Sequence, residues 1–226
     1  MYLKGRLGAI ADKIPQCDTL ADIGTDHAYI PVFAVQNSLC RKAIAADVKS
    51  GPVNIASRNV KRYGYENHIE TRLGYGLEPL KENEAEVIVI AGMGGVLIQE
   101  IMAGSLETAR NAKVLILQPM NLAEVLRKWL YENGFDILEE TLAEEGEKIY
   151  TILNVKWTGE SRELDEFYHY IGYGLAQRKD ALFKRYAMNK LKLLKKKITG
   201  MQKAVKQAEE LEKLIEIKNR LEAILL

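Results

Sequence analysis

The chain of 226 residues lacks most of the features that stabilise small secreted or metal-bound domains. It has only two cysteines, Cys17 and Cys40, and three scattered histidines, and no Cys-x-x-Cys pair occurs. We therefore expect neither a disulfide framework nor a metal site, and a reduced protein of the cytoplasm is the simplest interpretation. No run of about 18 apolar residues is present and the N-terminus lacks a signal-peptide core, so no membrane span is expected.

The net charge is also small, at +1, but it is unevenly distributed. Residues 161–226 hold 15 Lys and Arg against 9 Asp and Glu, a net charge of +6, which leaves residues 1–160 with a net charge of −5. A chain that is 47% hydrophobic can form one full domain and an appendage. We therefore predict a first domain over 1–160 and a basic second domain over 161–226 that meets an anionic partner.

In the first domain, apolar runs alternate with amphipathic segments. Strands are predicted at 19–23, 42–47, 69–73, 86–91, 114–117, 135–140 and 148–155, and helices at 2–14, 28–38, 52–63, 96–103 and 122–132. Such an order predicts an α/β fold, a Rossmann-like and mostly parallel sheet with helices on both faces. A closing antiparallel pair of strands is typical of the class I methyltransferase form of this architecture.

The second domain has a different pattern. From Arg178 onward there is no proline and one glycine, and apolar residues recur at three-four spacing. This predicts an α-helical coiled-coil hairpin with its turn between Thr199 and Glu209. The segment Arg178–Lys206 holds eleven Lys and Arg and one acid. Such a run is usually a solvated helix face, but it also suits contact with RNA phosphates, which we favour.

The turn after the first predicted strand carries acids where a dinucleotide site would carry glycines. Residues 19–31 read Thr-Leu-Ala-Asp-Ile-Gly-Thr-Asp-His-Ala-Tyr-Ile-Pro, in which Asp22 ends the strand and Gly24 follows it. A pyrophosphate needs Gly-x-Gly-x-x-Gly at a helix N-terminus, and Asp26 would repel it. S-adenosylmethionine (SAM) carries an ammonium and a sulfonium and no phosphate, so two acids favour it. Alternatively, Asp22 and Asp26 only cap the next helix.

The other candidate cofactor residues follow the predicted strands along the same edge of the sheet. Asp47 ends the second strand, where a carboxylate can accept both ribose hydroxyls, and Val48 can pack on the adenine. An ordinary strand-end acid is the alternative for Asp47. The remaining candidates around the cofactor are Thr25, His27, Tyr29, Gly74, Gly76, Leu77, Ala91, Gly92 and Met93. Histidines and Gly-rich turns are common structural features, so a purely structural role remains open for these residues.

The target side of the site is expected at the ends of the fourth and fifth strands. Ala91-Gly92-Met93-Gly94-Gly95 stands where amino-methylating enzymes usually carry Asn/Asp-Pro-Pro-Tyr. This leaves backbone groups and one thioether to line the pocket. Gln118 or Asn121 can read an adenine edge, although Asn121 can equally cap a helix. We predict Asp26 and Gln118 as the catalytic residues, with Asp26 close to the sulfonium.

Several of these motifs together resemble the bacterial tRNA (adenine-22) N1-methyltransferase family. They are Arg6-Leu7 with Ile10-Ala11, Asp22 to Tyr29, Asp47 with Gly51-Pro52, Arg72 to Gly74 with Gly76-Leu77, Ile90 to Gly95, and Leu115 to Pro119. The resemblance covers residues 3–155 densely and the tail only in type. It implies a SAM-dependent enzyme that methylates N1 of adenine 22 in tRNA, with Gly24, Asp26, Asp47 and the Gly92-Met93 turn around cofactor and target.

Three alternatives remain open at this point. One is a methyltransferase for another RNA position, a small molecule or a protein, and another is a non-catalytic SAM- or RNA-binding adaptor. An NAD-linked enzyme is a distant third, because the turn lacks the glycines and adds Asp26. The sequence does not indicate an oligomeric state.

Overall fold

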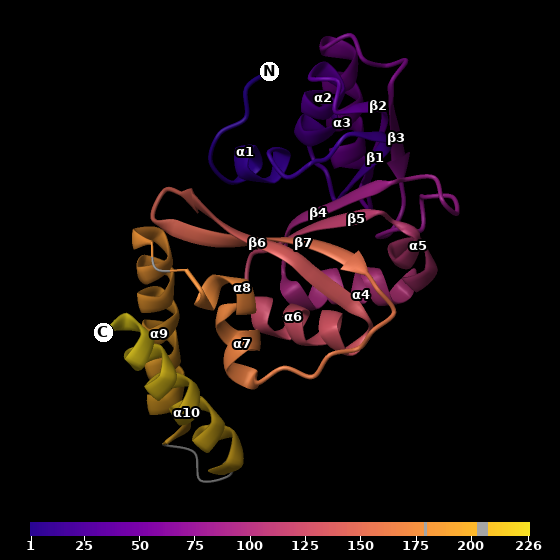
Figure 1. The fold of residues 1–226 in the computed structure, drawn as a ribbon. Coiled ribbons are helices and arrows are strands. Elements are labelled where there is room, and N and C mark those ends of the chain that lie inside the picture. Colours follow the sequence, from indigo (N-terminus) through magenta and orange to yellow (C-terminus); the bar gives the residue numbers. More distant parts are fainter. Residues whose placement is uncertain (179, 203–207) are drawn as a thin grey trace. The chain divides into compact units, whose positions relative to one another are not determined.

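The structure, a computed structural model, describes residues 1–178, 180–202 and 208–226. It contains two compact units, Met1–Arg162 and Glu163–Leu226 (Figure 1). Within the described ranges, no helix has both the length and the apolar character needed to cross a membrane. The same ranges hold no group of three or more His, Cys, Asp or Glu side chains arranged to bind a metal ion.

The first unit is built on one seven-stranded sheet with the order β3-β2-β1-β4-β5-β7-β6. The strands are β1 (Cys17–Ile23), β2 (Cys40–Asp47), β3 (Ile69–Leu73), β4 (Val87–Met93), β5 (Val114–Pro119), β6 (Phe135–Glu145) and β7 (Lys148–Trp157). The first five are parallel, and β7 runs antiparallel to both β5 and β6. The predicted α/β sheet with a closing antiparallel pair is therefore confirmed.

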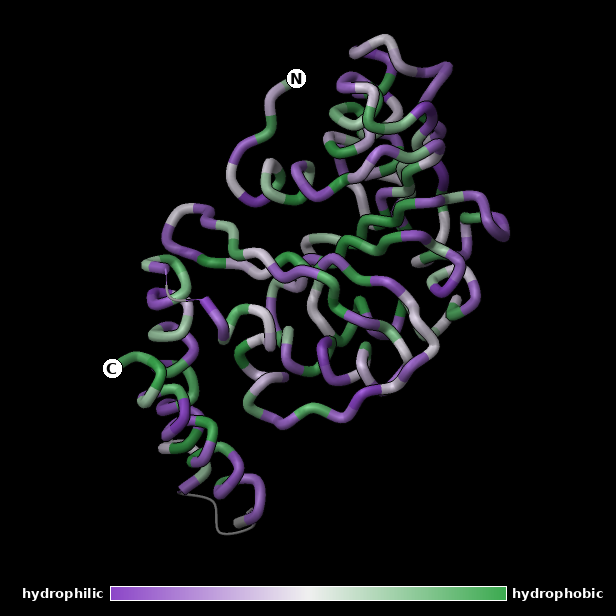
Figure 2. The backbone as a smooth tube through the Cα atoms, in the orientation of Figure 1, coloured by the Kyte–Doolittle hydropathy of each residue, from purple (hydrophilic) through white to green (hydrophobic). Residues whose placement is uncertain are grey.

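Helices cover both faces of this sheet. They are α1 (Gly5–Ala11), α2 (Tyr29–Gln36), α3 (Ser50–Arg62), α4 (Gly95–Gly104), α5 (Leu106–Asn111) and α6 (Ala123–Glu132). In Figure 1, α1 lies on one side of the strands β4 to β7, and α4 and α6 lie on the other. Because each face has its own helical layer, the middle strands contain continuous apolar runs, such as Val87 to Ala91 of β4 and Val114 to Leu117 of β5, and both strands are mainly green in Figure 2.

Successive residues of β4 show how the two cores divide. Ile88 and Ile90 pack with Ile98 and Met102 of α4, whereas Val87 and Val89 belong to the core of the opposite face, under α1, α2 and α3. These four β4 residues, 87–90, are at most 1% exposed. Successive side chains of the strand point to opposite faces, so each face of β4 contributes to its own core. Both sets are apolar, which explains why the sequence of β4 is a continuous apolar run.

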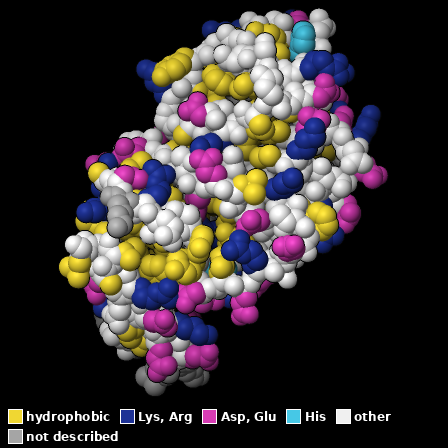
Figure 3. Space-filling model, in the orientation of Figure 1, with side chains coloured by type: hydrophobic (Ala, Val, Ile, Leu, Met, Phe, Trp, Pro, Cys, Tyr) yellow, Lys and Arg dark blue, Asp and Glu magenta, His cyan; other side chains and the backbone are white. Residues whose placement is uncertain are grey.

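Several bounds in the first unit differ from the sequence prediction, and β6 continues to Glu145, five residues beyond its predicted end at 140. The helix predicted at 2–14 begins only at Gly5, whose φ is +56°, after an extended Lys4. The short helix α5 was not expected, because Ser105 and the preceding glycine interrupt the apolar spacing. Charged side chains of both signs are interspersed over the face shown in Figure 3.

The second unit is helical. It contains α7 (Glu166–Ile171), α8 (Tyr173–Ala176), α9 (Ala181–Met201) and α10 (Ala208–Leu225). Asp165 caps α7 by accepting the Phe167 N–H at 2.8 Å and pairs with Arg220 of α10 at 2.7 Å. The helices α9 and α10 pack together, while residues 203–207, within the range predicted for the turn, lie outside the described residues.

Candidate active site

The site lies where the strand order reverses. The chain runs outward from β1 through β2 to β3 and then returns to place β4 on the other side of β1. In open parallel sheets, the carboxyl ends of the two strands at such a point leave a crevice between their outgoing turns. A pocket of about 220 Å³ opens here, lined by Arg6, Leu7, Asp22, Gly24, Thr25, Asp26, Tyr29, Ile30, Ala91 and Gly92.

The turn after β1 is anchored to the neighbouring strand. The backbone N–H groups of Gly24 and Thr25 both donate to the carbonyl of Ala46 on β2, at 2.8 and 3.1 Å. Gly24 has a φ of +76°, a conformation that is unfavourable for residues with a Cβ. The turn is therefore a fixed part of the site before any ligand binds.

Asp22 is buried at the end of β1, with 6% of its surface exposed. Burial raises the pKa of its carboxyl to about 7, and the negative charge of Asp26 adds to this, while a hydrogen bond with Thr25 acts in the opposite direction. No cation among the described residues is one of the causes that shift this pKa. A buried carboxylate without a cationic partner at the floor of a pocket suits a positively charged ligand.

The residues after Gly24 form a rigid entry to α2. Thr25 Oγ1 accepts the N–H of Ala28 at 3.0 Å, and Ala28 has the left-handed φ of +53°. The rings of His27 and Tyr29 stack with their centres 5.0 Å apart. Neither Asp22 nor Asp26 accepts a described hydrogen bond from the first turn of α2, so helix capping does not account for these acids.

Asp26 itself is open to solvent. Its side chain is 71% exposed, and Oδ2 lies 3.5 Å from Nε2 of His27. Asn59 of α3 steadies the same loop, because its Nδ2 donates to the His27 carbonyl at 3.0 Å. Asp26 therefore stands at the mouth of the pocket and Asp22 at its floor.

Asp47 lies further along the same edge, at the end of β2. Its Oδ1 accepts the Lys49 N–H at 2.7 Å, and its carbonyl accepts the N–H of Gly74 at 3.0 Å. The Oδ2 atom accepts no described hydrogen bond. Val48 is 55% exposed and Tyr75 is 42% exposed beside it, which leaves apolar surface where an adenine was predicted.

The glycines after β3 have packing reasons of their own. A Cβ on Gly74 would lie 2.5 Å from Pro79 Cγ, and one on Gly76 would lie 3.0 Å from a methyl group of Ile101. Leu77 is 1% exposed and belongs to the core with α4. These three predicted cofactor residues shape the loop from behind, and the side chain of Leu77 does not face the pocket.

The turn after β4 closes the other side of the site. The β4–β5 register shifts between Ala91 and Met93, a β-bulge with Gly92 at a φ of +78°. The Met93 carbonyl accepts the Met120 N–H at 2.7 Å, and Gly95 N–H donates to the Asn121 carbonyl at 3.0 Å. The N-cap of α6 is Leu122, so Asn121 does not cap that helix as the sequence allowed.

Gln118 is buried behind this turn. Its exposed fraction is 0%, Oε1 accepts from Arg6 Nη1 at 2.7 Å and from the Gly92 N–H at 3.1 Å, and Nε2 donates to the Pro119 carbonyl at 2.9 Å. The amide is fully used within the protein. In this geometry Gln118 supports the turn and does not present a free edge to an adenine.

The pocket thus brings together seven of the predicted residues from two strand ends and adds three that the sequence argument did not assign to the site. The additions are Arg6, Leu7 and Ile30. Apolar spacing predicts α1 as an amphipathic helix but says nothing about where that helix packs. Arg6-Leu7 is among the motifs that carry the family resemblance, but that motif did not indicate that Arg6 reaches the pocket.

These residues fit SAM. The acids Asp22 and Asp26 stand at the β1 turn, a third acid, Asp47, ends the next strand, and Gly24 keeps the turn between them free of a side chain. A ligand with two cationic groups at one end, followed by a ribose, matches this order. The fold and the site therefore define a Rossmann-like, SAM-dependent methyltransferase.

Comparison with known proteins narrows this class. The family described as "Methyltransferase domain" matches residues 3–153. The chain is 34% identical to the tRNA (adenine(22)-N(1))-methyltransferase of Bacillus subtilis, over 99% of this chain and 96% of that protein. The chain belongs to the family of bacterial tRNA (adenine(22)-N(1))-methyltransferases.

Two of the solved structures that this chain resembles contain SAM or its product. Streptococcus pneumoniae Sp1610 in complex with SAM aligns with a TM-score of 0.85 at 32% identity, covering 98% of each chain. Mycoplasma capricolum TrmK in complex with S-adenosyl-homocysteine aligns with a TM-score of 0.79 at 29% identity, covering 99% of this chain and 96% of that one. SAM is the cofactor of this methyltransferase family.

Proposed function

We propose that this chain transfers a methyl group from SAM to N1 of adenine 22 in tRNA. The observation that carries the proposal is the buried carboxylate of Asp22 below a turn that adds a second acid, Asp26. This arrangement suits a cationic cofactor and opposes a dinucleotide. The target is taken from the B. subtilis relative, which bears the name of this activity and matches over nearly the whole chain.

The cofactor residues have separate tasks in this proposal. SAM supplies an electrophilic methyl group on a sulfonium. Asp22 and Asp26 hold the positive charges of the methionine end, and Oδ2 of Asp47 accepts from the ribose. Val48 and Tyr75 cover the adenine of the cofactor with apolar surface.

The target adenine needs little chemical activation. Its N1 has a free lone pair once the base is unpaired, so no residue has to remove a proton before the attack. The product carries a positive charge, which Asp26 at the pocket mouth stabilises. The backbone of the Gly92 turn then has the task of positioning the base. Because N1 lies in the pairing edge of the base, the nucleotide must leave its stack to reach this pocket.

The basic helix α9 is the proposed contact for the tRNA body. Helix α9 contains no acid. Its Lys184, Lys192 and Lys196 are exposed and form no ion pair with a described residue. Phe183, Leu194 and Ile198 on the opposite side are buried, so the cations lie on a single solvent-facing side. Lys179, Lys203 and Lys206 of the predicted contact segment lie outside the described residues. We place the reaction in the cytoplasm, where tRNA is modified.

The test is to incubate the protein with labelled SAM and unmodified total tRNA and to map the labelled nucleoside. We expect N1-methyladenosine at position 22, and no label in a transcript with guanine at that position. Label at another RNA position, or only on small molecules, would contradict the target assignment. Binding of SAM with no transfer to any acceptor would instead indicate an adaptor.

A further inference from the structure

Arg6 of α1 reaches the turn after β4 through a buried amide. Arg6 Nη1 donates to Gln118 Oε1 at 2.7 Å, and the same oxygen accepts the N–H of Gly92 at 3.1 Å. The orientation of the amide is fixed, because Nε2 donates to the Pro119 carbonyl at 2.9 Å. Arg6 and Gly92 are thereby linked across three elements, α1, β5 and β4.

Arg6 is itself held by residues of β6 and β7, the last two strands in the sheet order. Its Nε lies 3.5 Å from Glu145 Oε2 on β6, and its guanidinium carbon lies 5.8 Å from the centre of the Tyr150 ring on β7. The side chain is 18% exposed. A guanidinium held at this many points is a rigid anchor for the Gln118 amide.

The turn that receives this support has no side chain suited to hold a polar base edge. Ala91 and Gly92 line the pocket, and Gly92 is a β-bulge residue with a φ of +78°. Only backbone N–H and C=O groups there can bind the base. Their positions depend on two hydrogen bonds to residues outside the turn. The Gly92 N–H donates to Gln118 Oε1, and the Met120 N–H donates to the Met93 carbonyl.

We propose that Arg6 is a positioning residue for methyl transfer, which acts through Gln118 to hold the Gly92 turn in the geometry that receives the target base. The proposal rests on the proposed function of this site. A misplacement of about 1 Å at a reacting centre can lower a rate by about 100-fold, so support of this kind affects kcat more than cofactor binding.

The competing role for Arg6 is direct contact with the RNA. Arg6 also lines the pocket, and its Nε makes no hydrogen bond with a described residue. The two roles differ in how Arg6 and Gln118 combine. Residues that act through one another give losses that do not add, whereas an independent phosphate contact by Arg6 would add to the effect of Gln118.

The test is a double-mutant cycle on the full chain with unmodified tRNA. Arg6→Met and Gln118→Met should each lower kcat by about 10- to 100-fold and leave the Kd for SAM unchanged. The double variant should be no slower than the slower single variant. Losses that multiply, a higher KM for tRNA at unchanged kcat, or full activity of Arg6→Met would overturn the proposal.

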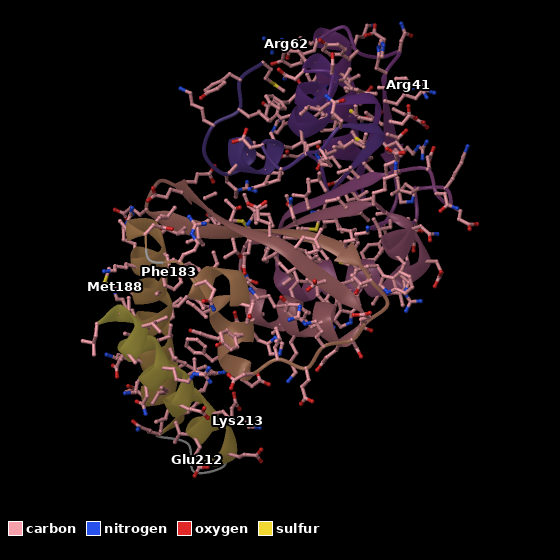
Figure 4. All side chains as sticks on the ribbon, in the orientation of Figure 1. Arg41, Arg62, Phe183, Met188, Glu212 and Lys213 are labelled. Carbon is pink, nitrogen blue, oxygen red and sulfur yellow. The ribbon has the colours of Figure 1, made fainter. Side chains whose placement is uncertain are left out.

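Arg41→Met is the matched control. Arg41 lies at the opposite edge of the sheet, where it pairs with Asp18 at 2.6 Å, and its side chain is 65% exposed (Figure 4). Its replacement should leave kcat unchanged. A loss of kcat in this control equal to that of Arg6→Met would mean that any lost arginine impairs the protein, and would overturn a specific role for Arg6.

A second readout separates this proposal from the function on which it rests. In Arg6→Met, hydrogen exchange at the Gly92 amide, followed by NMR, should be faster than in the wild type, because Gln118 loses its anchor. An unchanged Gly92 amide would overturn the positioning role even if Gln118→Met failed to fold. If wild-type protein methylates no tRNA, the proposed function fails while the Gly92 measurement still decides the role of Arg6.

Discussion

The methyl group of Met93 lies directly over Gly24, so closely that a Cβ on Gly24 would stand 1.9 Å from Met93 Cε. The contact joins the turn after β1 to the turn after β4 across the switch point of the sheet. Any side chain at position 24 would displace the thioether and fill the space that the cofactor needs. The turn after β1 and the turn after β4 are therefore in contact, and a change at Gly24 alters the position of Met93.

Gly24→Ala should abolish detectable SAM binding while the fold survives. Gly64→Ala is a matched control, because Gly64 has the same φ of +76° and no atom within 4 Å of the added Cβ. Both variants should lose about 1–2 kcal/mol of unfolding free energy from the left-handed backbone. Calorimetric titration with SAM should show heat for Gly64→Ala and none for Gly24→Ala. Equal SAM affinity in both variants would refute the close approach at Gly24.

The affinity for SAM should depend on pH through Asp22. Burial raises the pKa of its carboxyl to about 7, and a cationic ligand needs the ionised form. The Kd should therefore fall by about tenfold from pH 6 to pH 8, which corresponds to the release of one proton on binding. Asp22→Asn should bind weakly and show no such slope. A slope that persists in Asp22→Asn would assign the proton to another group.

The raised pKa of Asp22 also affects the stability of the free protein. Rising pH strengthens SAM binding but weakens the folded state without SAM. Between the ordinary pKa of an aspartate and about 7, the folded state holds a proton at Asp22 that the unfolded state has released. The contribution of Asp22 to stability is thus complete at low pH and is lost as the pH rises through about 7. Thermal unfolding across this range should show a flatter pH dependence for Asp22→Asn, and saturating SAM should stabilise the wild type more at pH 8 than at pH 6.

Asp26→Ala tests the electrostatic role at the pocket mouth. We expect a loss of about tenfold in the single-turnover rate on unmodified tRNA, because an exposed carboxylate is partly screened by water until substrate covers it. Asp18→Ala, at the far edge of the sheet, is the control and should react at the wild-type rate. Full single-turnover activity of Asp26→Ala would remove Asp26 from catalysis and leave it a role in the turn alone.

The charge of α9 should govern tRNA affinity. Lys192→Glu should weaken tRNA binding by about tenfold and reduce its dependence on salt, because one phosphate contact is replaced by a repulsion. Lys213→Glu, on α10, reverses an exposed lysine that pairs with Glu209 at 2.9 Å and should have little effect (Figure 4). Filter binding at two salt concentrations measures both. Equal losses in the two variants would indicate only a general effect of net charge.

The sequence was sufficient for the sheet and for the position of Asp22 and Gly24 at the carboxyl end of β1. The strand β3 has the bounds that its apolar pattern predicted, 69–73, and the class of fold followed from continuous apolar strands between helices. Asp22 and Gly24 were recognisable because a local turn fixes both. Arg6 was not assigned to the site, since 112 residues separate it from Gln118 and only tertiary packing brings them together. The packing contacts of Gly74 and Gly76 were equally invisible, because a glycine needed by a ligand and one needed by a neighbouring side chain look the same in sequence.

A buried ion pair outside the pocket provides a stability prediction. Arg127 of α6 and Glu140 of β6 pair with side chains that are 0% and 2% exposed, and Arg127 Nε donates to Glu140 Oε1 at 3.0 Å. Arg127→Met removes the guanidinium from this buried pair and should lower the unfolding free energy by about 3–5 kcal/mol.

The double variant Arg127→Met, Glu140→Leu removes both charges and should recover most of that loss, since apolar groups of similar size avoid the desolvation of two ions. Denaturant unfolding of the single and double variants measures the difference. A double variant no more stable than Arg127→Met would contradict this prediction, and a double variant well below the wild type would mean that the pair stabilises the protein beyond the cost of burying its charges. The SAM affinity of the folded double variant should match that of the wild type, because neither residue lines the pocket below the acidic turn.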